Sequence, residues 1–183
     1  MWKVLFDGKS LDAWRGYKSD TVPQGWKIND GVLTKDGRPA DLISRDEFGD
    51  FELELEWKIA PGGNSGIFYR GSEEYDHIYW SAPEYQLLDD EKAEDNETRL
   101  TCAGAAYAIY PSPSGHLKPV GEFNATRIVA RGAHVEQLAE RLQAARIRAL
   151  EPGLGSQGES EQVRTLCQLR PRETPALRDP GRP

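Results

Sequence analysis

The sequence comprises 183 residues, of which 38% are hydrophobic and 29% are charged, and its formal net charge is −7. It contains no apolar run near the roughly 20 residues that a membrane-spanning helix needs, and its acidity argues against non-specific binding to nucleic acid. These features predict a globular protein of one domain, or one domain with a tail, that neither spans a membrane nor binds nucleic acid.

The first 136 residues show a pattern of short strands separated by turns. A hairpin is predicted around Asn29-Asp30-Gly31, because these residue types favour the tight turns that join antiparallel strands. Residues 51–57 alternate strictly between apolar residues and glutamates, which is typical of a strand with one buried face. Further strands are expected at 67–70, 84–88, 104–110 and 124–130. This spacing predicts an all-β fold of antiparallel strands, a sandwich or a jelly roll.

Three glutamates, Glu52, Glu54 and Glu56, share one face of the predicted strand 51–57. We expect this face to be exposed and to favour solubility, because no cationic residue stands beside them in the sequence. The alternative is a catalytic pair, since carboxylates on alternate strand positions lie about 6–7 Å apart, close to the separation in glycosidases.

The composition changes near residue 137. The last 47 residues contain eight arginines but no lysine, and none of the seventeen aromatic residues of the chain. Residues 135–150 are rich in Ala, Leu, Glu, Gln and Arg, which predicts a helix, and the Gly, Ser, Pro and Arg after Pro152 predict disorder. The chain thus divides into a β domain, 1–136, and a tail of different character, 137–183.

Polar side chains share faces on several of the expected strands. Because side chains alternate along a strand, Glu84 and Gln86 point the same way, as do Glu122 and Asn124, while Arg70 ends the strand 67–70. A sheet face with these groups and nearby aromatic rings suits sugars, whose hydroxyls bond to such side chains and whose C–H faces pack on rings. The alternative is a solvated sheet face with an ordinary ion pair.

Five motifs occur in order along the chain: Leu5-Phe-Asp-Gly-Lys-Ser-Leu-Asp-Ala-Trp14, Gly49-Asp-Phe-Glu-Leu53, Pro61-Gly-Gly-Asn-Ser-Gly-Ile-Phe-Tyr-Arg70, Pro83-Glu-Tyr-Gln-Leu-Leu-Asp89 and Lys118-Pro-Val-Gly-Glu-Phe-Asn124. Residues 4–136 therefore resemble the bacterial DUF1080 family, also called the 3-keto-disaccharide hydrolase domain. Phe123 stands where that family usually has tryptophan. The resemblance implies a concanavalin A-like jelly-roll sandwich, here incomplete at its C-terminal strands.

The resemblance also implies an enzyme that cleaves glycosides already oxidised to a ketone at C3. That carbonyl acidifies the proton on C2, so a carboxylate can remove it as general base, and a guanidinium can stabilise the resulting enolate. Loss of the C1 substituent and addition of water then complete hydrolysis. The implied partner is a small saccharide substrate.

The resemblance and the strand positions together assign candidate roles. Glu84 is the expected base or acid and Arg70 the expected stabiliser of the oxyanion. The expected substrate-binding residues are Asn64, Ser65, Gln86, Glu122 and Asn124. No motif calls for a metal, and the cofactor stays unknown, although a divalent ion could share the role of Arg70. The alternatives are a non-catalytic carbohydrate-binding module of lectin-like fold and, more remotely, a glycosidase that uses the Glu52–Glu56 row.

The tail contains none of the segments with which the resembled family continues. Residues 137–141 can, however, be encoded as CAA CTG GCT GAA CGG, which one nucleotide later reads Asn-Trp-Leu-Asn and then glycine, as in that family. Codons allowed by residues 142–151 can continue this frame as Phe-Lys-Leu-Leu-Glu-Tyr-Glu-Leu-Trp. We therefore predict that the residues from about 137 onward arise from a frameshift.

No secretory leader precedes the first motif, which begins at Leu5. The sequence as written predicts a cytoplasmic protein. A leader encoded upstream would instead make the protein periplasmic or secreted.

Overall fold

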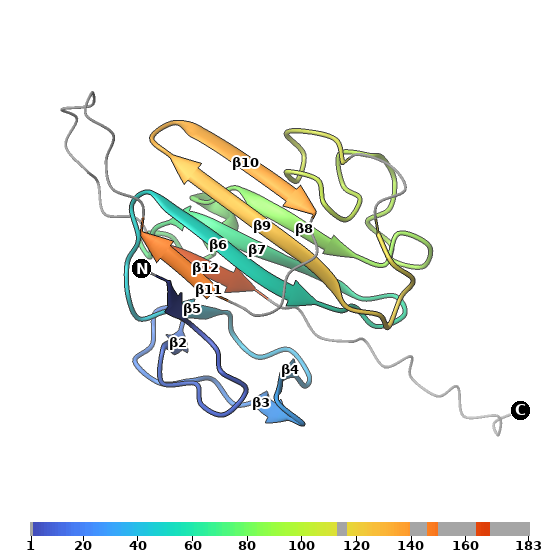
Figure 1. Ribbon diagram of the computed structural model, residues 1–183. Coiled ribbons are helices and arrows are strands. Elements are labelled where there is room, and N and C mark those ends of the chain that lie inside the picture. Colours follow the sequence, from blue (N-terminus) through green and yellow to red (C-terminus); the bar gives the residue numbers. More distant parts are fainter. Residues whose placement is uncertain (1, 113–116, 140–145, 150–163, 169–183) are drawn as a thin grey trace, which may run out of the picture.

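The structure is a computed structural model that describes residues 2–112, 117–139, 146–149 and 164–168 (Figure 1). These residues form strands and one short 3-10 turn. The elements are β1 (Lys3–Val4), β2 (Trp14–Gly16), β3 (Trp26–Asn29), β4 (Val32–Lys35), β5 (Leu42–Ser44), β6 (Phe51–Trp57), β7 (Asn64–Gly71), η1 (Ile78–Trp80), β8 (Glu84–Leu88), β9 (Asn124–Arg131), β10 (His134–Ala139), β11 (Arg146–Ala149) and β12 (Arg164–Gln168).

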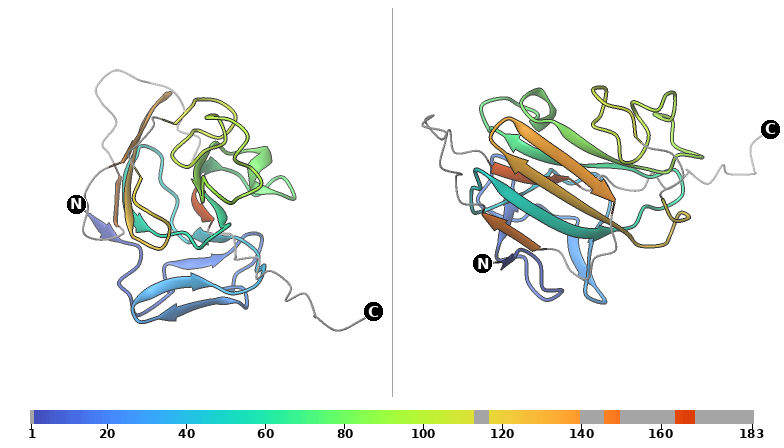
Figure 2. Two further views of the ribbon diagram at one scale, coloured as in Figure 1. Left: turned by 90° about the vertical axis from the view of Figure 1, so that its right-hand side faces the viewer. Right: turned by 45° about the horizontal axis from the view of Figure 1, so that its top comes forward.

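Two five-stranded antiparallel sheets pack face to face. Sheet A has the order β1-β11-β6-β9-β10, and sheet B has the order β2-β5-β12-β7-β8. The hairpin β3–β4 stands apart from both sheets, and Figure 2 shows it at one end of the two layers. The predicted all-β sandwich is therefore confirmed. Within the described ranges, no helix has the length and apolar character needed to cross a membrane.

The main core lies between the two sheets. Sheet A contributes the apolar face of β6, namely Phe51, Leu53, Leu55 and Trp57, as its alternation predicts. Sheet B contributes Ile67 and Tyr69 from β7 and Tyr85 and Leu87 from β8. The opposite face of sheet B carries a smaller apolar cluster of Ile43, Phe68 and Ile78. Alternate residues of β7 and β8 thus face either the core or the outside of the sandwich.

Hydrogen bonds cross this core from sheet to sheet. The indole nitrogen of Trp57 donates to the hydroxyl of Thr126 at 2.9 Å, and that hydroxyl donates to the phenol oxygen of Tyr85 at 3.0 Å. The side-chain amide of Gln137 donates to the phenol oxygen of Tyr69 at 2.9 Å. Burial raises the pKa of both tyrosines, Tyr85 and Tyr69, so both stay neutral at physiological pH. They hold the layers together as neutral groups.

The predicted hairpin is confirmed. β3 pairs with β4 in the register Asn29↔Val32, and the turn residues Asp30 and Gly31 have φ angles of 49° and 75°. Two consecutive positive φ angles are what a two-residue turn between twisted antiparallel strands requires.

The expectation of an exposed glutamate row on β6 is wrong for two of its three members. Glu52 is only 2% exposed, and Glu54 is also buried, whereas Glu56 is exposed. Arg127 on the neighbouring strand β9 pairs with Glu52 at 2.5 Å and lies 3.9 Å from Glu54. The cationic partner that the local sequence lacked comes from a strand far along the chain, and it allows the carboxylates to be buried.

The helix predicted over residues 135–150 is also wrong. Residues 134–139 form β10, which pairs with β9 through a turn at Gly132, whose φ is 52°, and residues 146–149 form β11. Pairing with an existing sheet edge outweighs a helix propensity of a few tenths of a kcal/mol per residue. Residues 164–168, expected to be disordered, form β12, and the rest of the tail lies outside the described residues.

Candidate functional site

The outer face of sheet B brings together the two central residues predicted for catalysis and binding. Tyr85 and Leu87 of β8 face the core, so Glu84 and Gln86 face outward. In the register with β7, Glu84 lies opposite Phe68 and Gln86 lies opposite Gly66. This register places Glu84 and Gln86 on the same face of sheet B, as the alternation of side chains along the strand predicts.

The Glu84 carboxylate lies directly over Gly66. A β-carbon placed on Gly66 would be 1.8 Å from Oε1 of Glu84, so only glycine leaves room for the carboxylate in this position. Glu84 is 9% exposed and Gln86 1% exposed. Among the described residues, Oε1 of Gln86 is buried and has no hydrogen-bond partner. This buried acceptor lacks the hydrogen bond that such groups normally make in folded proteins.

A loop segment extends this face beyond the edge strand β8. The amide of Tyr107 donates to the carbonyl of Glu84 at 3.0 Å, and the amide of Gln86 donates to the carbonyl of Ala105 at 3.0 Å. This places Tyr107 beside Glu84 in register, a position that we had not predicted as part of the site. The strand expected at 104–110 is wrong, because the segment forms only the isolated bridges Tyr85↔Ala106 and Ala106↔Tyr110.

An aromatic turn covers the adjacent part of the same face. Ile78 in η1 packs against Phe68, while Tyr79 and Trp80 are 48% and 59% exposed. The His77 ring stacks on Tyr79 at 4.9 Å and meets the edge of Trp80 at 5.2 Å. Exposed, mutually oriented rings are surfaces on which the C–H faces of a sugar can pack. The run His77-Ile-Tyr-Trp80, three rings within four residues, is the sequence signal that could have identified this turn.

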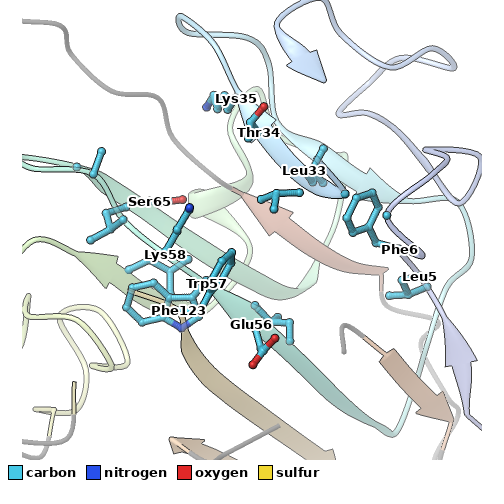
Figure 3. A pocket seen from close by; sticks show the side chains of 18 of the residues that line it. Leu5, Phe6, Leu33, Thr34, Lys35, Glu56, Trp57, Lys58, Ser65 and Phe123 are labelled. Carbon is cyan, nitrogen blue, oxygen red and sulfur yellow. The ribbon is translucent and has the colours of Figure 1, made fainter. Parts of the chain in front are cut away.

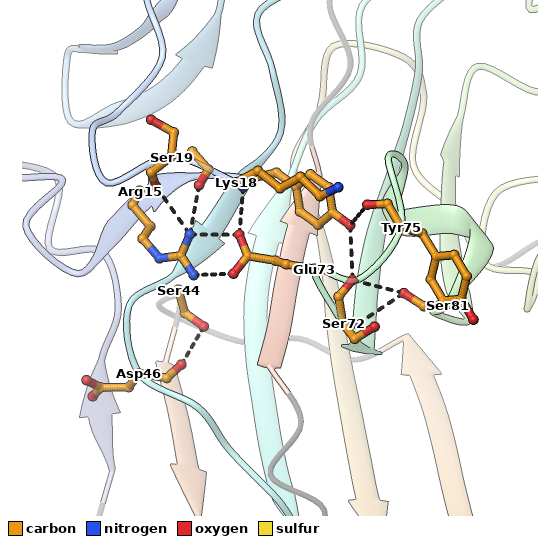
Figure 4. Close-up of polar contacts among 11 residues, drawn as sticks. Arg15, Lys18, Ser19, Ser44, Asp46, Ser72, Glu73, Tyr75 and Ser81 are labelled. Carbon is orange, nitrogen blue, oxygen red and sulfur yellow. Dashed lines mark hydrogen bonds and ion pairs between the residues drawn. The ribbon is translucent and has the colours of Figure 1, made fainter.

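The loop that carries the aromatic turn is anchored by an ion pair (Figure 4). Arg15 of β2 donates to both carboxylate oxygens of Glu73, at 2.8 and 2.6 Å, and the amide of Lys18 donates to the same carboxylate at 2.6 Å. The hydroxyl of Tyr17 donates to the carbonyls of Ser72 and Tyr75 at 3.0 and 2.7 Å. A bidentate guanidinium–carboxylate pair fixes both distance and orientation, so it holds the loop over sheet B.

Arg70 does not join Glu84. The backbone φ of Arg70 is 56°, which departs from the strand conformation. Its guanidinium forms an ion pair with Asp50 at 3.5 Å. The Asp50 carboxylate also accepts a hydrogen bond from the backbone amide of Gly132. The described residues show no contact between Arg70 and Glu84. The expected convergence of the two groups is therefore not seen, and Arg70 instead links β7 to the end of sheet A.

The other predicted binding residues lie in different places. Asn64 donates to Asp95 at 2.7 Å and so fixes the loop that follows β8, whereas Ser65 points inward and is buried. Glu122 is exposed in the loop before β9, and Asn124 is buried, with its side-chain oxygen accepting the amide of Lys118 at 2.9 Å. Of the predicted set, Glu84, Gln86 and Asn64 lie on the outer face of sheet B by the register, and the side chain of Asn64 is held by Asp95.

A large cavity lies elsewhere, between the hairpin β3–β4 and the end of the sandwich (Figure 3). Its volume is about 1010 Å³. Trp57 and Phe123 line one side, and Phe6 and Leu33 line the opposite side. Ser65 is the only predicted site residue in its lining. Its walls are mainly apolar, and the charged or polar side chains of Asp7, Lys9, Thr34, Lys35, Glu56 and Lys58 also line it.

No protein metal centre is evident in the part of the chain that the structure describes. There, no three His, Cys, Asp or Glu side chains come together as metal ligands.

A family model for the 3-keto-alpha-glucoside-1,2-lyase-like domain matches residues 1–159. The chain belongs to this family. A relative from Bacteroides thetaiotaomicron named 3-keto-disaccharide hydrolase is 38% identical over 148 residues, covering 69% of this chain and 51% of the relative. The chain thus spans about half the length of that relative.

Solved structures support the fold independently. A protein from Parabacteroides distasonis that is provisionally classed as a glycosyl hydrolase is 26% identical and superposes with a TM-score of 0.69, over 84% of this chain and 73% of its own. A second structure of that class from the same organism is 22% identical, with a TM-score of 0.68 over 96% of this chain and 93% of its own. At 22% identity, the similarity to this second structure shows a shared fold and nothing more.

Proposed function

We propose that this domain cleaves the glycosidic bond of a saccharide oxidised to a ketone at C3, and that Glu84 moves the proton on C2. The observation that carries the proposal is the buried Glu84–Gln86 pair on the outer face of sheet B, in a chain of the 3-keto-alpha-glucoside-1,2-lyase-like family. The name of the Bacteroides relative supports the same substrate class.

The proposed reaction begins with the Glu84 carboxylate. It takes the proton from C2, and the electron pair of the broken C–H bond forms the enolate of the C3 ketone. Collapse of the enolate forms a C1–C2 double bond and expels the C1 oxygen, which takes up a proton. Water then adds, its oxygen to C1 and a proton to C2, so that the net change is hydrolysis.

Gln86 and the aromatic turn serve binding in this proposal. The unpartnered Oε1 of Gln86 accepts a hydrogen bond from a sugar hydroxyl, which removes the cost of a buried unsatisfied acceptor, about 1–3 kcal/mol. Tyr79 and Trp80 give the ring of the sugar an apolar surface. For Arg70 to stabilise the oxyanion, its guanidinium has to separate from Asp50 when the substrate binds.

The test is a Glu84→Gln variant with Glu97→Gln, an exposed glutamate of a neighbouring loop, as matched control. We expect Glu84→Gln to lower kcat on a 3-keto-disaccharide by about 10²–10⁴-fold, the contribution of a positioned acid or base, while saccharide binding persists. Exchange of the C2 proton with D₂O should stop in the same variant. Full activity of Glu84→Gln would refute the assignment.

A carbohydrate-binding function without catalysis is the second candidate, and the exposed rings of Tyr79 and Trp80 favour it. Under that alternative, the wild-type chain binds saccharides saturably but releases no product from the 3-keto-disaccharide. An unoxidised disaccharide separates both functions from an ordinary glycosidase, because neither proposal predicts its cleavage.

A further inference from the structure

The loop segment 104–107 extends the outer face of sheet B directly beside Glu84. Tyr85 and Ala106 form an isolated antiparallel bridge. Because Tyr85 faces the core, Ala106 lies on that side of the sheet, and the next residue of each segment points to the outer side. Tyr107 is therefore the cross-strand neighbour of Glu84 on the outer face, and its amide donates to the Glu84 carbonyl at 3.0 Å.

Backbone hydrogen bonds hold this segment at both of its ends. The amide of Gly104 donates to the carbonyl of Gln86 at 2.8 Å, and the amide of Ala108 donates to the carbonyl of Leu100 at 2.9 Å. The φ of 59° at Ala108 ends the extended conformation directly after Tyr107. A side chain on a backbone that is fixed in this way keeps a defined position, which acid–base chemistry requires.

The two cross-strand pairs on this part of the face differ in their exposure to solvent. Gln86 and Ala105 are 1% and 0% exposed. Glu84 is 9% exposed, and Tyr107 is half-buried. The Glu84–Tyr107 pair is thus the more open end of the face, where a ligand can approach both side chains.

The proposed reaction needs a proton donor at this place. The carboxylate that removes the C2 proton and the acid that protonates the departing C1 oxygen act on neighbouring carbon atoms, so the two groups have to stand close together. Cross-strand neighbours on one face have their β-carbons about 4.5–5.5 Å apart. A phenol carries its proton at neutral pH and can donate it to an oxygen that becomes negatively charged.

We infer that Tyr107 is the acid that protonates the C1 oxygen of the leaving group, an inference that rests on the proposed function of Glu84. As the C1–O bond breaks, its electron pair takes the phenol proton, and the leaving group departs as an alcohol. The phenolate then takes a proton from water, whose oxygen bonds to C1, while Glu84 returns its proton to C2. Both side chains end in their starting forms.

The experiment compares Tyr107→Phe with the wild type on two 3-keto-glucosides that differ in the leaving group, a disaccharide and a nitrophenyl glucoside. We expect kcat on the disaccharide to fall about 10²-fold or more, because a sugar oxygen leaves readily only with a proton. Cleavage of the nitrophenyl substrate should be nearly unchanged, since nitrophenolate is stable as an anion. The matched control is Tyr110→Phe in the same loop, where the tyrosine is 71% exposed, and it should change neither rate.

Exchange of the C2 proton with D₂O separates the roles of the two residues. Tyr107→Phe should still exchange this proton at the wild-type rate, because the Glu84 carboxylate is intact, and the same signal shows that the variant is folded. A purely structural role of Tyr107 would instead slow the exchange and the cleavage of both substrates together.

Three results would overturn the inference. They are full activity of Tyr107→Phe on the 3-keto-disaccharide, equal losses on the two substrates, and loss of C2 exchange in this variant. Failure of the proposed function has a different signature, because it appears in Glu84→Gln as undiminished C2 exchange. A wild-type chain that cleaves neither substrate would overturn both proposals.

Discussion

At the scale of single residues, the contact between Gly66 and Glu84 is the sharpest constraint on the site. No side chain larger than hydrogen fits at Gly66 without moving the Glu84 carboxylate, since a β-carbon there would lie 1.8 Å from Oε1. The glycine therefore belongs to the geometry of the proposed base, although it carries no functional group itself.

This contact predicts the effect of Gly66→Ala. The added methyl displaces the flexible carboxylate, and we expect kcat/KM on a 3-keto-disaccharide to fall about 10²-fold, as for other misplacements near 1 Å. Gly49→Ala is the matched control, because a β-carbon on Gly49 meets nothing within 4 Å. Unchanged kinetics in a folded Gly66→Ala variant would show that the carboxylate position does not matter.

The core tyrosines predict the pH dependence of stability. Burial raises the pKa of Tyr85 above the ordinary value of 10.0, so the folded state keeps its phenol proton at pH values where the unfolded chain releases it. The stability from this group is complete below pH 10 and is lost as the pH rises from there through the folded pKa. Tyr69 acts in the same direction.

We therefore expect the free energy of unfolding to decline more steeply above pH 10 in the wild type than in Tyr85→Phe. Urea titrations at a series of pH values measure both slopes. Tyr85→Phe also removes the acceptor of the Thr126 hydroxyl, which lowers stability by a similar amount at every pH, so the difference in slope is the informative quantity. Parallel slopes would contradict the assignment.

Residue-level features could be predicted from the sequence where they depend on strand periodicity alone. Glu84 and Gln86 share a face because side chains alternate in β8. The direction of Arg70 could not be predicted, because its positive φ interrupts that alternation. The burial of Glu52 could not be predicted either, because its partner Arg127 lies on a strand that is distant in the sequence.

At the scale of elements, the loop over sheet B depends on the Arg15–Glu73 pair. Both side chains are largely buried, and the Glu73 carboxylate accepts hydrogen bonds from a guanidinium and a backbone amide. Because this loop carries Tyr79 and Trp80, its anchoring determines where the proposed sugar surface stands. The residues of the pair are thus positioning residues that do not contact the substrate.

Glu73→Gln is expected to lower stability by about 1–3 kcal/mol, the cost of leaving a buried charged group poorly paired. The same variant should raise KM for the saccharide with little change in kcat, because the loop loosens while Glu84 stays in place. Hydrogen exchange of residues 72–81 should accelerate. The control is Asp76→Asn, which breaks the exposed pair with Lys18 and should alter stability by less than about 1 kcal/mol.

Strands in the first part of the chain were predictable because alternation and turn residues agree there. β6 and β8 match their predicted ranges residue for residue, and the hairpin β3–β4 forms around its predicted turn. β10 was not predictable, because its residues favour helix and only the edge of β9 makes them a strand. Segment 104–110 was mistaken for a strand, because its apolar residues pack as a loop along β8.

At the scale of the whole molecule, the two sheets share one core, and that core is uneven. Aromatic residues and neutral hydrogen bonds fill the region around Tyr85 and Thr126, whereas the region beside the hairpin holds the cavity of about 1010 Å³. We propose that the break in composition after residue 136 reflects the change of reading frame predicted near residue 137.

This explanation makes a prediction about the protein whose frame is restored from residue 137. Its tail would bring large apolar residues into the sandwich, so more surface is buried on folding. We therefore expect a higher denaturant midpoint and a larger m-value than for the chain as written, because m scales with the surface exposed on unfolding. The control is a restored chain in which the apolar residues of the new tail are replaced by serine. It should lose the gain in stability. Resequencing of the locus comes first: an intact frame through residue 183, or equal m-values for the two chains, would show that the tail as written is the native one.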